Sequence, residues 1–560
     1  MKNIATLFLL MVALQQSTRS QSLVWARSMG AAYSDIAYAV TTDADGNVYT
    51  TGSFRLTVDF DPGDGVYELT ALGSTDIFVS KLDADGNFLW AVNMGGTTSA
   101  NGEAIAINSD GNCVVTGNFS ETIDVDPSDE VFNLTAVDGS DMFAAILDEA
   151  GNLIWAGAMG GPGFQYSGAV AIDAAGNIVI GGFFGNSCDF DPNAGESIIT
   201  TAEGSAFVVK LQADGTFMWV RHIEGATDSN VNCWDMALDS NDNILLAGSF
   251  SGTVDFNMGA GAFELTSAGS TDIYVCKLDA NGDFLWAAGM GNGSADTAFA
   301  VDTDSDDNVH VSGNFIHTID FDPGPDVSNL TSASTSDHDT FVWKLTAAGA
   351  FVWAKGLGGD DNEFPTSIAV DAAGTVYTVG GFDGTCDFDP GASVFELEPA
   401  SVNFFDIYIS VLDVNGEFVW AGSMGSTGND RPEDVTVDAQ GHPIVCGSFT
   451  LTVDMDPTSS EYELTGVYDA FVLKLNAIEN DIVENTFTYR VDAFPNPTSN
   501  FFTLETTAPA KTAYIITDIK GSIIRTGNTS GKITTVNLSS IENGVYFLQL
   551  EEQVVKLVKE

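Results

Sequence analysis

Short apolar runs alternate with polar turns along almost the whole chain. In residues 36–92, runs such as Val48–Phe54 and Asp76–Leu82 lie next to turns with the sequence Asp-Ala-Asp-Gly-Asn. β-Branched and aromatic residues favour strands, and glycine supplies the positive φ that tight hairpin turns need. No segment shows a sustained helical period of apolar residues. The pattern therefore predicts an all-β protein built from antiparallel hairpins.

A block of about 66 residues, read as four strands plus a small inserted hairpin, is repeated along the chain. The tryptophans that mark the copies are Trp25, Trp90, Trp155, Trp219, Trp286, Trp353 and Trp420. A second marker, a Phe–Asp pair five residues apart, occurs as Phe54/Asp59, Phe119/Asp124, Phe184/Asp189, Phe250/Asp255, Phe315/Asp320, Phe382/Asp387 and Phe449/Asp454. Four-stranded antiparallel units in series are propeller blades, and each covers the apolar face of its neighbour. The sequence predicts a seven-bladed β-propeller over residues 21–477.

The two ends of the repeat array predict that the propeller closes on itself. The first Trp segment, Leu23–Met29, precedes any complete block, and the last block stops at Leu475 without a Trp strand. We expect the N-terminal segment to supply the missing outer strand of blade seven, which leaves no unpaired blade edge. The blocks resemble SBBP repeats in their Asp-x-Asp-Gly-Asn turns, Gly-x-Phe and Leu-x-Trp. That resemblance implies the architecture and no general activity.

Residues 1–20 have the pattern of a secretory signal peptide. Lys2 gives a positive start, residues 4–14 an apolar core, and Thr18 and Ser20 are small residues before a cleavage point at Gln21. The apolar core is too short to cross a bilayer. No other segment approaches 18 unbroken apolar residues, so we expect no membrane span in the mature chain.

The composition changes near residue 480, where the acidic repeats end. Residues 478–490 are predicted to be a polar linker, and residues 491–560 an Ig-like β-sandwich of about seven short strands. The order and spacing of residues 493–498, residues 514–521, Gly544 and Lys556 resemble the type A sorting domain of the bacterial type IX secretion system. The resemblance implies recognition by the type IX machinery, export through the periplasm, and a secreted or surface-attached product. An ordinary adhesive sandwich is the alternative.

The charge balance narrows the classes of partner. The chain has 78 acidic and 19 basic residues, a net charge of −59. Like charges repel, so we expect no binding to nucleic acid or to anionic membranes. The negative net charge favours the binding of cations or basic partners, or it serves only to keep the protein soluble outside the cell.

An Asp-x-Asp pair, usually followed by proline, is the most regular acidic motif. The pairs form a candidate Ca²⁺ set: Asp59, Asp61, Asp124, Asp126, Asp189, Asp191, Asp320, Asp322, Asp387, Asp389, Asp454 and Asp456. In the fourth block the pair is Asp255 and Asn257. On a strand, residues i and i+2 face the same way about 6.6 Å apart, and Ca²⁺ binds carboxylate and backbone oxygens. Alternatively, the first Asp accepts backbone N–H groups and the second opens a turn.

No catalytic constellation is visible, because catalysis needs a local asymmetric group of residues. His310 replaces an apolar strand residue, which predicts a packed and hydrogen-bonded side chain. A metal site formed by His310, His317 and His338 is the alternative. The six cysteines show no CxxC and are expected to be buried thiols, with a chance disulfide between adjacent blades as the alternative.

These observations favour a secreted or surface-attached, non-enzymatic propeller that acts in binding, adhesion or as a scaffold. The expected partner is an extracellular protein or polysaccharide, and no cofactor other than Ca²⁺ is indicated. The alternative is an extracellular glycan hydrolase or lyase with its site in the central channel. Polar residues at the channel mouth that break the sevenfold pattern would mark such a site. A third option is a module that only displays and spaces other groups.

Overall fold

The computed structural model describes residues 21–402, 404–458, 460–478, 491–506, 511–518, 522–550 and 553–560. The predicted signal peptide and most of the predicted linker lie outside these ranges. The chain divides into two compact parts, Met1–Ile478 and Glu479–Glu560. We call the described residues of the first part the repeat domain and those of the second part the C-terminal domain.

The described residues are organised as β-strands and turns, and they contain no helix, as the alternation of apolar and polar positions predicted. In particular, this part of the chain has no helix long and apolar enough to cross a membrane. The protein is therefore of the all-β class.

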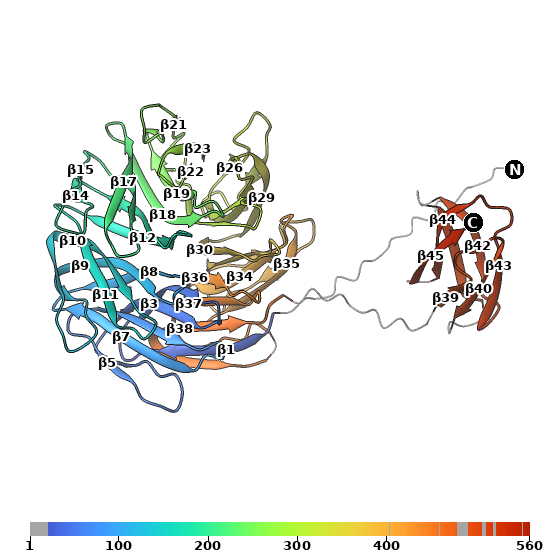
Figure 1. The fold of residues 1–560 in the computed structure, drawn as a ribbon, viewed down its shortest axis with the longest axis horizontal. Coiled ribbons are helices and arrows are strands. Elements are labelled where there is room, and N and C mark those ends of the chain that lie inside the picture. The colour runs from blue at the N-terminus through green and yellow to red at the C-terminus, as the bar shows by residue number, and fades with distance from the viewer. Residues whose placement is uncertain are drawn as a thin grey trace. The chain divides into compact units, whose positions relative to one another are not determined.

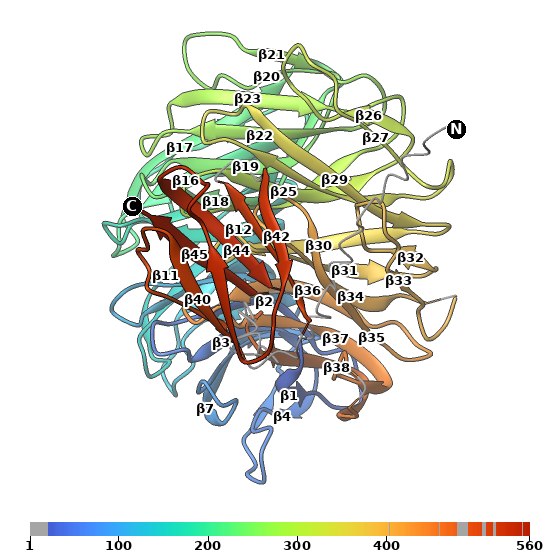
Figure 2. The same ribbon diagram turned by 90° about the vertical axis from the view of Figure 1, so that its right-hand side faces the viewer.

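The strands of the repeat domain pair antiparallel in groups of four, which we call units 1 to 7 (Figures 1 and 2). Units 1 to 4 contain β2 (Ile36–Thr42), β3 (Val48–Phe54), β6 (Asp76–Leu82) and β7 (Phe88–Gly96); β8 (Ala100–Ile107), β9 (Cys113–Asp124), β10 (Asn133–Leu147) and β11 (Leu153–Met159); β12 (Gln165–Ile172), β13 (Ile178–Phe184), β16 (Ser205–Leu211) and β17 (Phe217–Gly225); and β18 (Asn230–Leu238), β19 (Ile244–Ser251), β22 (Asp272–Leu278) and β23 (Phe284–Met290). Units 5 to 7 contain β24 (Thr297–Thr303), β25 (Val309–Phe315), β28 (Asp339–Leu345) and β29 (Phe351–Gly359); β30 (Glu363–Val370), β31 (Val376–Phe382), β34 (Asp406–Leu412) and β35 (Phe418–Met424); and β36 (Arg431–Val437), β37 (Pro443–Asp454), β38 (Glu463–Leu475) and β1 (Leu23–Met29).

A small hairpin is inserted between the second and third strands of every unit. In five units it consists of separate short strands: β4 (Thr57–Asp59) with β5 (Glu68–Thr70), β14 (Ser187–Asp189) with β15 (Ile198–Thr200), β20 (Thr253–Asp255) with β21 (Glu264–Thr266), β26 (Thr318–Asp320) with β27 (Asn329–Thr331), and β32 (Cys386–Asp387) with β33 (Glu396–Leu397). In units 2 and 7 the hairpin continues the long strands β9 and β10, and β37 and β38. The inserted hairpin predicted from the sequence is confirmed.

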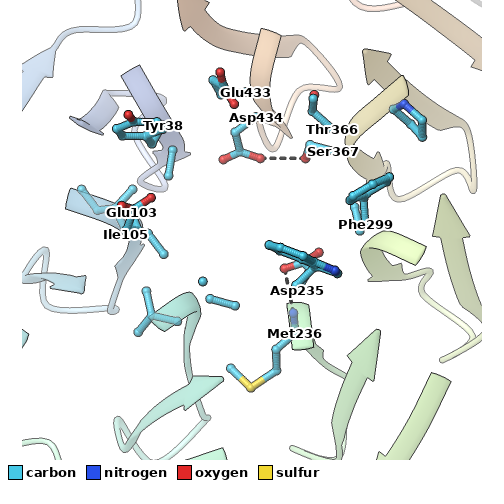
Figure 3. Close-up of a pocket in the computed structure, with 18 of the residues that line it drawn as sticks. Tyr38, Glu103, Ile105, Asp235, Met236, Phe299, Thr366, Ser367, Glu433 and Asp434 are labelled. Atoms are coloured by element: carbon cyan, nitrogen blue, oxygen red, sulfur yellow. Dashed lines mark hydrogen bonds between the residues drawn. The ribbon is translucent and has the colours of Figure 1, made fainter. Parts of the chain in front are cut away.

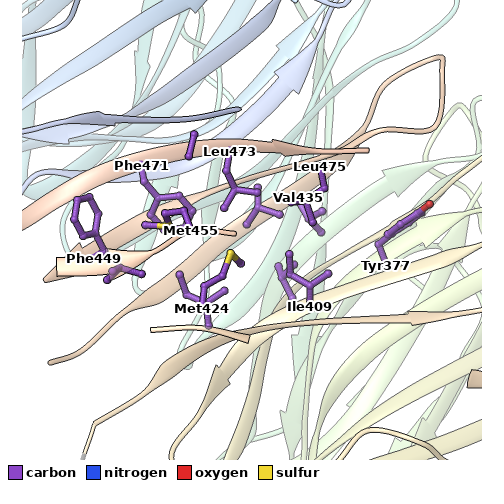
Figure 4. Close-up of a cluster of buried hydrophobic side chains, with 14 of the residues drawn as sticks. Tyr377, Ile409, Met424, Val435, Phe449, Met455, Phe471, Leu473 and Leu475 are labelled. Carbon is purple, nitrogen blue, oxygen red and sulfur yellow. The ribbon is translucent and has the colours of Figure 1, made fainter. Parts of the chain in front are cut away.

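Apolar side chains from consecutive units interleave to form the core. Figure 4 shows one such cluster, in which Ile409 and Met424 of unit 6 pack with Val435, Phe449 and Phe471 of unit 7. All five side chains are buried. Burial of apolar surface is the dominant favourable term in folding, so each unit depends on its neighbour for stability.

The outer-strand tryptophans join each unit to the next. The Trp90 Nε1–H of unit 1 donates to the Glu149 carbonyl, in a turn of unit 2, at 2.9 Å. In the corresponding turn of unit 3, a Cβ added to Gly215 would lie 2.1 Å from the Trp155 ring. Glycine is therefore required there both by its positive φ of 82° and by the close approach of the indole. The recurring tryptophans and turn glycines are packing residues.

The N-terminal strand takes the fourth place in unit 7. β1 pairs antiparallel with β38, from Leu23 opposite Leu475 to Met29 opposite Ala470. In Figure 1 the blue strand β1 accordingly lies beside the orange strand β38. The Trp25 Nε1–H donates to the Ala84 carbonyl of unit 1 at 3.1 Å. The junction of units 7 and 1 thus has the same contact as the junctions within the array.

Buried lysines anchor the first turn of several units. In unit 4, Lys277 Nζ lies 2.7 Å from Asp239 Oδ2, and in unit 3 Lys210 Nζ lies 2.8 Å from Asp173 Oδ2. These four side chains are at most 5% exposed. The ammonium group holds the pKa of Asp239 below its usual value, together with hydrogen bonds from Asn243 and from backbone N–H groups and against the opposing effect of burial. Half of the ten basic residues in residues 21–480 are lysines of this kind, so they are not free to bind a partner.

The C-terminal domain has seven strands in two sheets. One sheet has the order β39 (Val491–Phe494), β40 (Phe501–Thr506) and β43 (Ile533–Asn537), and the other has the order β42 (Ile523–Asn528), β41 (Ala513–Asp518), β44 (Gly544–Leu550) and β45 (Gln553–Lys559). Leu504, Ile516, Val536 and Leu548 from both sheets share one buried core. The strand count agrees with the sequence prediction.

The β1 pairing generates a prediction about stability. Trp25 is 4% exposed and the adjacent Val24 is 45% exposed. We expect Trp25→Ala to lower the free energy of unfolding by about 3–5 kcal/mol, since a buried aromatic side chain is removed. Val24→Ala should change it by less than about 0.5 kcal/mol. Deletion of residues 21–30 should lower the melting temperature of the repeat domain further. Melting curves unchanged by the deletion would show that β1 does not stabilise unit 7.

Candidate functional site

The first strand of each unit, β2, β8, β12, β18, β24, β30 and β36, lies innermost, and we call these the inner strands. Each inner strand contacts the next one along the chain, and β36 contacts β2. Residues from all seven inner strands line one cavity of about 490 Å³, the inner cavity (Figure 3). Its size lies in the range of sites for small ligands or single side chains.

A β-bulge occurs at the same place in every inner strand. The bulged residues that the pairing passes over are Tyr38, Glu103, Gly168, Trp234, Phe299, Thr366 and Glu433. All seven line the inner cavity. A bulge leaves one residue unpaired and re-aims its side chain, and bulges are frequent next to functional sites. At a position where the backbone repeats seven times, the chain thus presents six different residue types to the cavity.

Aromatic side chains from units 3, 4 and 5 form one wall of the cavity. The ring centroids of Tyr166 and Trp234 are 6.3 Å apart, and those of Trp234 and Phe299 are 6.2 Å apart. Phe183 supports this row from behind, with its centroid 5.3 Å from Trp234. Because each ring packs against another, the wall is held in place before any ligand arrives.

Two glutamates with perturbed pKa values line the cavity from units 2 and 7. Burial raises the pKa of Glu103 to about 7. Burial also raises the pKa of Glu433 to about 7, an effect that the Arg431 charge opposes and the Glu103 charge reinforces. Arg431 itself is exposed. Clustered carboxyl groups with raised pKa values are typical of functional sites.

Two aspartates that line the cavity accept hydrogen bonds from backbone N–H groups. Asp434 Oδ2 accepts the Val40 N–H of unit 1 at 2.9 Å, and its Oδ1 accepts the Val435 N–H and the Ser367 hydroxyl. Asp235 in the same way accepts N–H groups of its own unit and of unit 5, at 2.7 and 2.8 Å. These carboxylates tie neighbouring inner strands together.

None of these cavity residues was predicted from the sequence. The available signal was a position whose residue type varies strongly between copies, as Tyr38, Trp234 and Thr366 illustrate. A comparison of the seven copies column by column would have singled out this position, although it would not have shown that a bulge lies there.

The Asp-x-Asp pairs lie in the inserted hairpins, and none of the twelve predicted Ca²⁺ residues lines the inner cavity. Asp59 Oδ1 accepts the N–H groups of Asp61 (3.1 Å) and Tyr67 (2.7 Å), and Asp61 Oδ1 accepts the Gly63 N–H (2.9 Å). The other hairpins repeat these bonds; in unit 4, Asn257 Oδ1 accepts the Gly259 N–H at 3.0 Å.

One expectation about these pairs was wrong. Both aspartates were placed on one face of a strand, but β4 ends at Asp59, and Asp61 lies in the following loop. The carboxylate of Asp59 folds the chain into a turn by accepting the N–H two residues later, which ends the strand. The described residues contain no group of three His, Cys, Asp or Glu side chains able to hold a metal ion. The arrangement is the backbone-bonding alternative, and Ca²⁺ binding stays a prediction.

The histidines and cysteines, which do not recur in every unit, lie where structural side chains are expected. His310 is buried, and its Nε2 lies 3.2 Å from Asp304 Oδ2, so its packing as a hydrogen-bonded side chain is confirmed. His317 is exposed, with Nδ1 3.0 Å from Ser294 Oγ. All six cysteines are buried and unpaired.

Residues 492–560 match the family model of the secretion system C-terminal sorting domain. The match covers the C-terminal domain and confirms the sorting-domain prediction. The chain therefore carries a type IX signal for export to the cell surface or for secretion.

Comparisons over longer stretches find repeat proteins. The uncharacterized WD repeat-containing protein L264 of Acanthamoeba polyphaga mimivirus is 22% identical over 506 residues, which cover 76% of this chain and 36% of the viral protein. The chain spans well under half the length of the curated relatives it matches. The WD40 domain of Pan2 from Neurospora crassa is 8% identical, with 83% of this chain and 97% of that domain covered and a TM-score of 0.39. PorZ, a surface component of the type IX secretion system of Porphyromonas gingivalis, is 11% identical, with 96% and 100% covered and a TM-score of 0.18.

The hairpin geometry separates a hydrogen-bonding role of Asp59 from a calcium-binding one. We expect Asp59→Ala to lower the free energy of unfolding by about 1–2 kcal/mol, because two loop N–H groups lose their acceptor. Asp59→Asn keeps an oxygen acceptor and should cost less than about 0.5 kcal/mol. Denaturant titration of both variants measures the difference. If EDTA lowers the melting temperature of the wild-type chain but not that of Asp59→Asn, a bound Ca²⁺ ion is the cause instead.

Proposed function

We propose that the protein is a secreted or surface-attached seven-bladed β-propeller of the SBBP type, and that it binds an extracellular ligand in its inner cavity without catalysis. The seven units are its blades, and β1 completes the last blade. The pairing of β1 with β38 and the contact of β36 with β2 support closure of the ring. The C-terminal domain is an Ig-like sandwich that the type IX machinery recognises.

The main support for this proposal is that residue types recur at packing positions of the seven units but differ at the seven bulges. At several packing positions outside the inner cavity the same residue recurs in unit after unit, as the buried Phe54, Phe119 and Phe184 illustrate. At the seven bulges the residue types diverge, although the backbone geometry does not. Packing alone requires no such divergence, so a ligand that contacts the seven positions differently explains it.

The aromatic wall supports binding of an extracellular protein or polysaccharide. Trp and Tyr side chains supply large rigid contact areas at low cost in conformational entropy, and they are enriched among the residues that dominate binding energy. The polar bulge residues Thr366 and Glu433 border the same cavity and provide hydrogen-bonding groups that orient a ligand.

A glycan-active enzyme is the second candidate, and the two glutamates favour it. Most glycoside hydrolases use a pair of carboxyl groups, one of which is kept protonated by a raised pKa. Glu103 and Glu433 both have pKa values raised to about 7, and Trp234 lines the same cavity. Under this second candidate, Glu103 and Glu433 are the residues that we assign to acid–base chemistry.

A glycan array run beside a hydrolase and lyase activity panel, on the mature full-length chain, tests both candidates. We expect binding without turnover, and a loss of affinity of at least about tenfold in Trp234→Ala, since stacking on the indole is removed. Phe263→Ala, which truncates a partly exposed aromatic side chain on a hairpin outside the cavity, is the matched control.

Turnover that disappears in Glu103→Gln or Glu433→Gln would establish the enzyme instead. Binding that Trp234→Ala leaves unchanged would place the ligand outside the inner cavity and contradict the proposal.

A further inference from the structure

The inner cavity, taken as the ligand site proposed above, has walls that select by charge. Among the lining residues that the structure describes, Arg431 is the one basic side chain, and it is exposed. Glu103 and Glu433 point into the cavity from their bulges, and neither forms an ion pair within 4.0 Å in the described residues. A buried carboxylate without a counter-ion is costly, so a positive group beside the two glutamates would be favourable.

The aromatic wall complements the glutamates. Figure 3 shows Glu103 and Glu433 on one side of the cavity and Phe299 on the other. The faces of Trp and Tyr attract cations through the ring quadrupole, most strongly where water is excluded. A positive group in this cavity therefore gains from both walls at once, whereas a neutral group gains only from the aromatic wall and an anionic group is repelled by the glutamates.

We propose that the ligand carries an ammonium or guanidinium group that pairs with Glu103 and Glu433 while its apolar part lies against Trp234. The group has two sources, a lysine or arginine side chain of a polypeptide and a free polyamine. A short Lys/Arg peptide and spermidine represent them in calorimetric titrations of the mature full-length chain.

Titrations at roughly physiological salt suppress long-range attraction to the acidic surface. We expect binding of at least one probe, and a loss of about tenfold in affinity in each of Glu103→Gln and Glu433→Gln. Glu196→Gln makes the same change of charge on an exposed hairpin loop and should leave the affinity unchanged. Binding of the peptide alone identifies a polypeptide partner, and binding of spermidine alone identifies a polyamine.

The outcomes separate this inference from the proposed function. Binding that all three Gln variants weaken equally would mean general surface attraction and overturn the inference. A neutral glycan that binds in a Trp234-dependent way, with no effect of the glutamate substitutions, would overturn the choice of ligand and keep the binding function. Failure of both cations and glycans to bind would overturn both.

A second inference rests on different residues, the buried pairs that join neighbouring units. One member lies in the third strand of a unit, and the other lies at the start of the inner strand of the next unit or directly precedes it. At most junctions the backbone N–H of the residue in the second unit donates to a carbonyl in the first unit. The acceptor is the carbonyl of the residue just before the other member of the pair, as when Glu363 donates to the His338 carbonyl. The pairs are Asp76 with Ala100, Asp141 with Gln165, Ser205 with Val231, Asp272 with Asp296, Asp339 with Glu363, Asp406 with Asp430, and Asp469 with Asp35.

Four of the seven junctions place two buried carboxyl groups together, and oxygens without a hydrogen-bond partner occur at three of them. These are Asp272 Oδ1, Asp339 Oδ1, Glu363 Oε1 and Asp406 Oδ1. Where the second residue is Ala100, both oxygens of Asp76 accept backbone N–H groups.

The junction of units 2 and 3 has a glutamine where other junctions have a second carboxyl group, and this glutamine supplies a hydrogen-bond donor. Gln165 begins β12 opposite Phe184, as Glu363 begins β30 opposite Phe382. In the orientation that satisfies its surroundings, the Gln165 amide nitrogen donates to the Ser140 carbonyl at 2.8 Å and to Asp141 Oδ1 at 3.2 Å. A donor therefore belongs at this position, and a carboxyl group donates only when it is protonated.

A proton fits this place better than a metal ion. At no junction do the described residues form a group of three His, Cys, Asp or Glu side chains able to hold a metal ion, whereas Ca²⁺ takes six to eight oxygens. The groups that influence the pair of Asp339 and Glu363 by charge are Asp337, Asp383 and Cys386, and none of them is basic; the ring of the neighbouring His338 packs against Phe364. Burial and mutual repulsion raise the pKa of Glu363 to about 9, and burial raises that of Asp339 to about 7.

We infer that the buried carboxyl pairs between units are proton-binding sites, in which one protonated carboxyl group donates to its partner across the junction. Because the folded-state pKa of such a group lies above its unfolded value, the folded chain binds more protons than the unfolded chain. The stability that each pair contributes is present at low pH and is lost as the pH rises through the folded-state pKa.

Glu363→Gln copies the junction of units 2 and 3 and tests the inference. We expect its melting temperature to depend less steeply on pH than that of the wild type between about pH 6 and about pH 9. We also expect the infrared spectrum to lose intensity in the C=O stretch of protonated carboxyl groups. Gln165→Glu, the reverse change, should steepen the pH dependence. Asp430→Asn gives a second measurement at the next junction.

An unchanged pH dependence and infrared spectrum in a folded Glu363→Gln chain would overturn the inference. A melting temperature that EDTA lowers in the wild type, and no longer lowers in Glu363→Gln, would replace the proton with a cation.

Discussion

Packing of one sheet against the next is the constraint on which the rest of this structure depends. A single four-stranded unit leaves a face of Phe, Val and Ile side chains exposed, and only a neighbouring unit covers it. The tryptophan contacts and the turn glycines hold each unit against its neighbour, and the buried Lys–Asp pairs fix turns within a unit. The inner cavity follows from the same constraint, because the first strands of the units converge where the sheets meet.

The features that depend on periodicity could be predicted from the sequence. Strand positions, the inserted hairpins and the role of Leu23–Met29 as an added strand follow from apolar alternation and turn residues, which recur seven times and so reinforce one another. The strands of the C-terminal domain followed from the order of its motifs. Each of these features leaves a mark in the residue types themselves.

The candidate site could not be predicted in the same way. A bulge adds one residue to a strand without changing its composition, so Tyr38 and Trp234 read as ordinary strand residues. The role of Asp59 depends on whether its carboxylate reaches N–H groups of its own loop, and spacing alone does not decide that. Which carboxyl groups meet across a junction depends on contacts between residues 24 positions apart, or at opposite ends of the repeat domain for Asp35 and Asp469.

The pairing of β1 with β38 also bears on when the chain can fold. Leu23 and Leu475 lie more than 400 residues apart, so the ladder between β1 and β38 can form only when both ends of the repeat domain are present. Contacts of such long sequence separation slow folding, since the cost of loop closure precedes the gain from pairing. Unit 7 is consequently completed only when residues from both ends of the repeat domain have met, so we expect its fourth strand to be added late in folding.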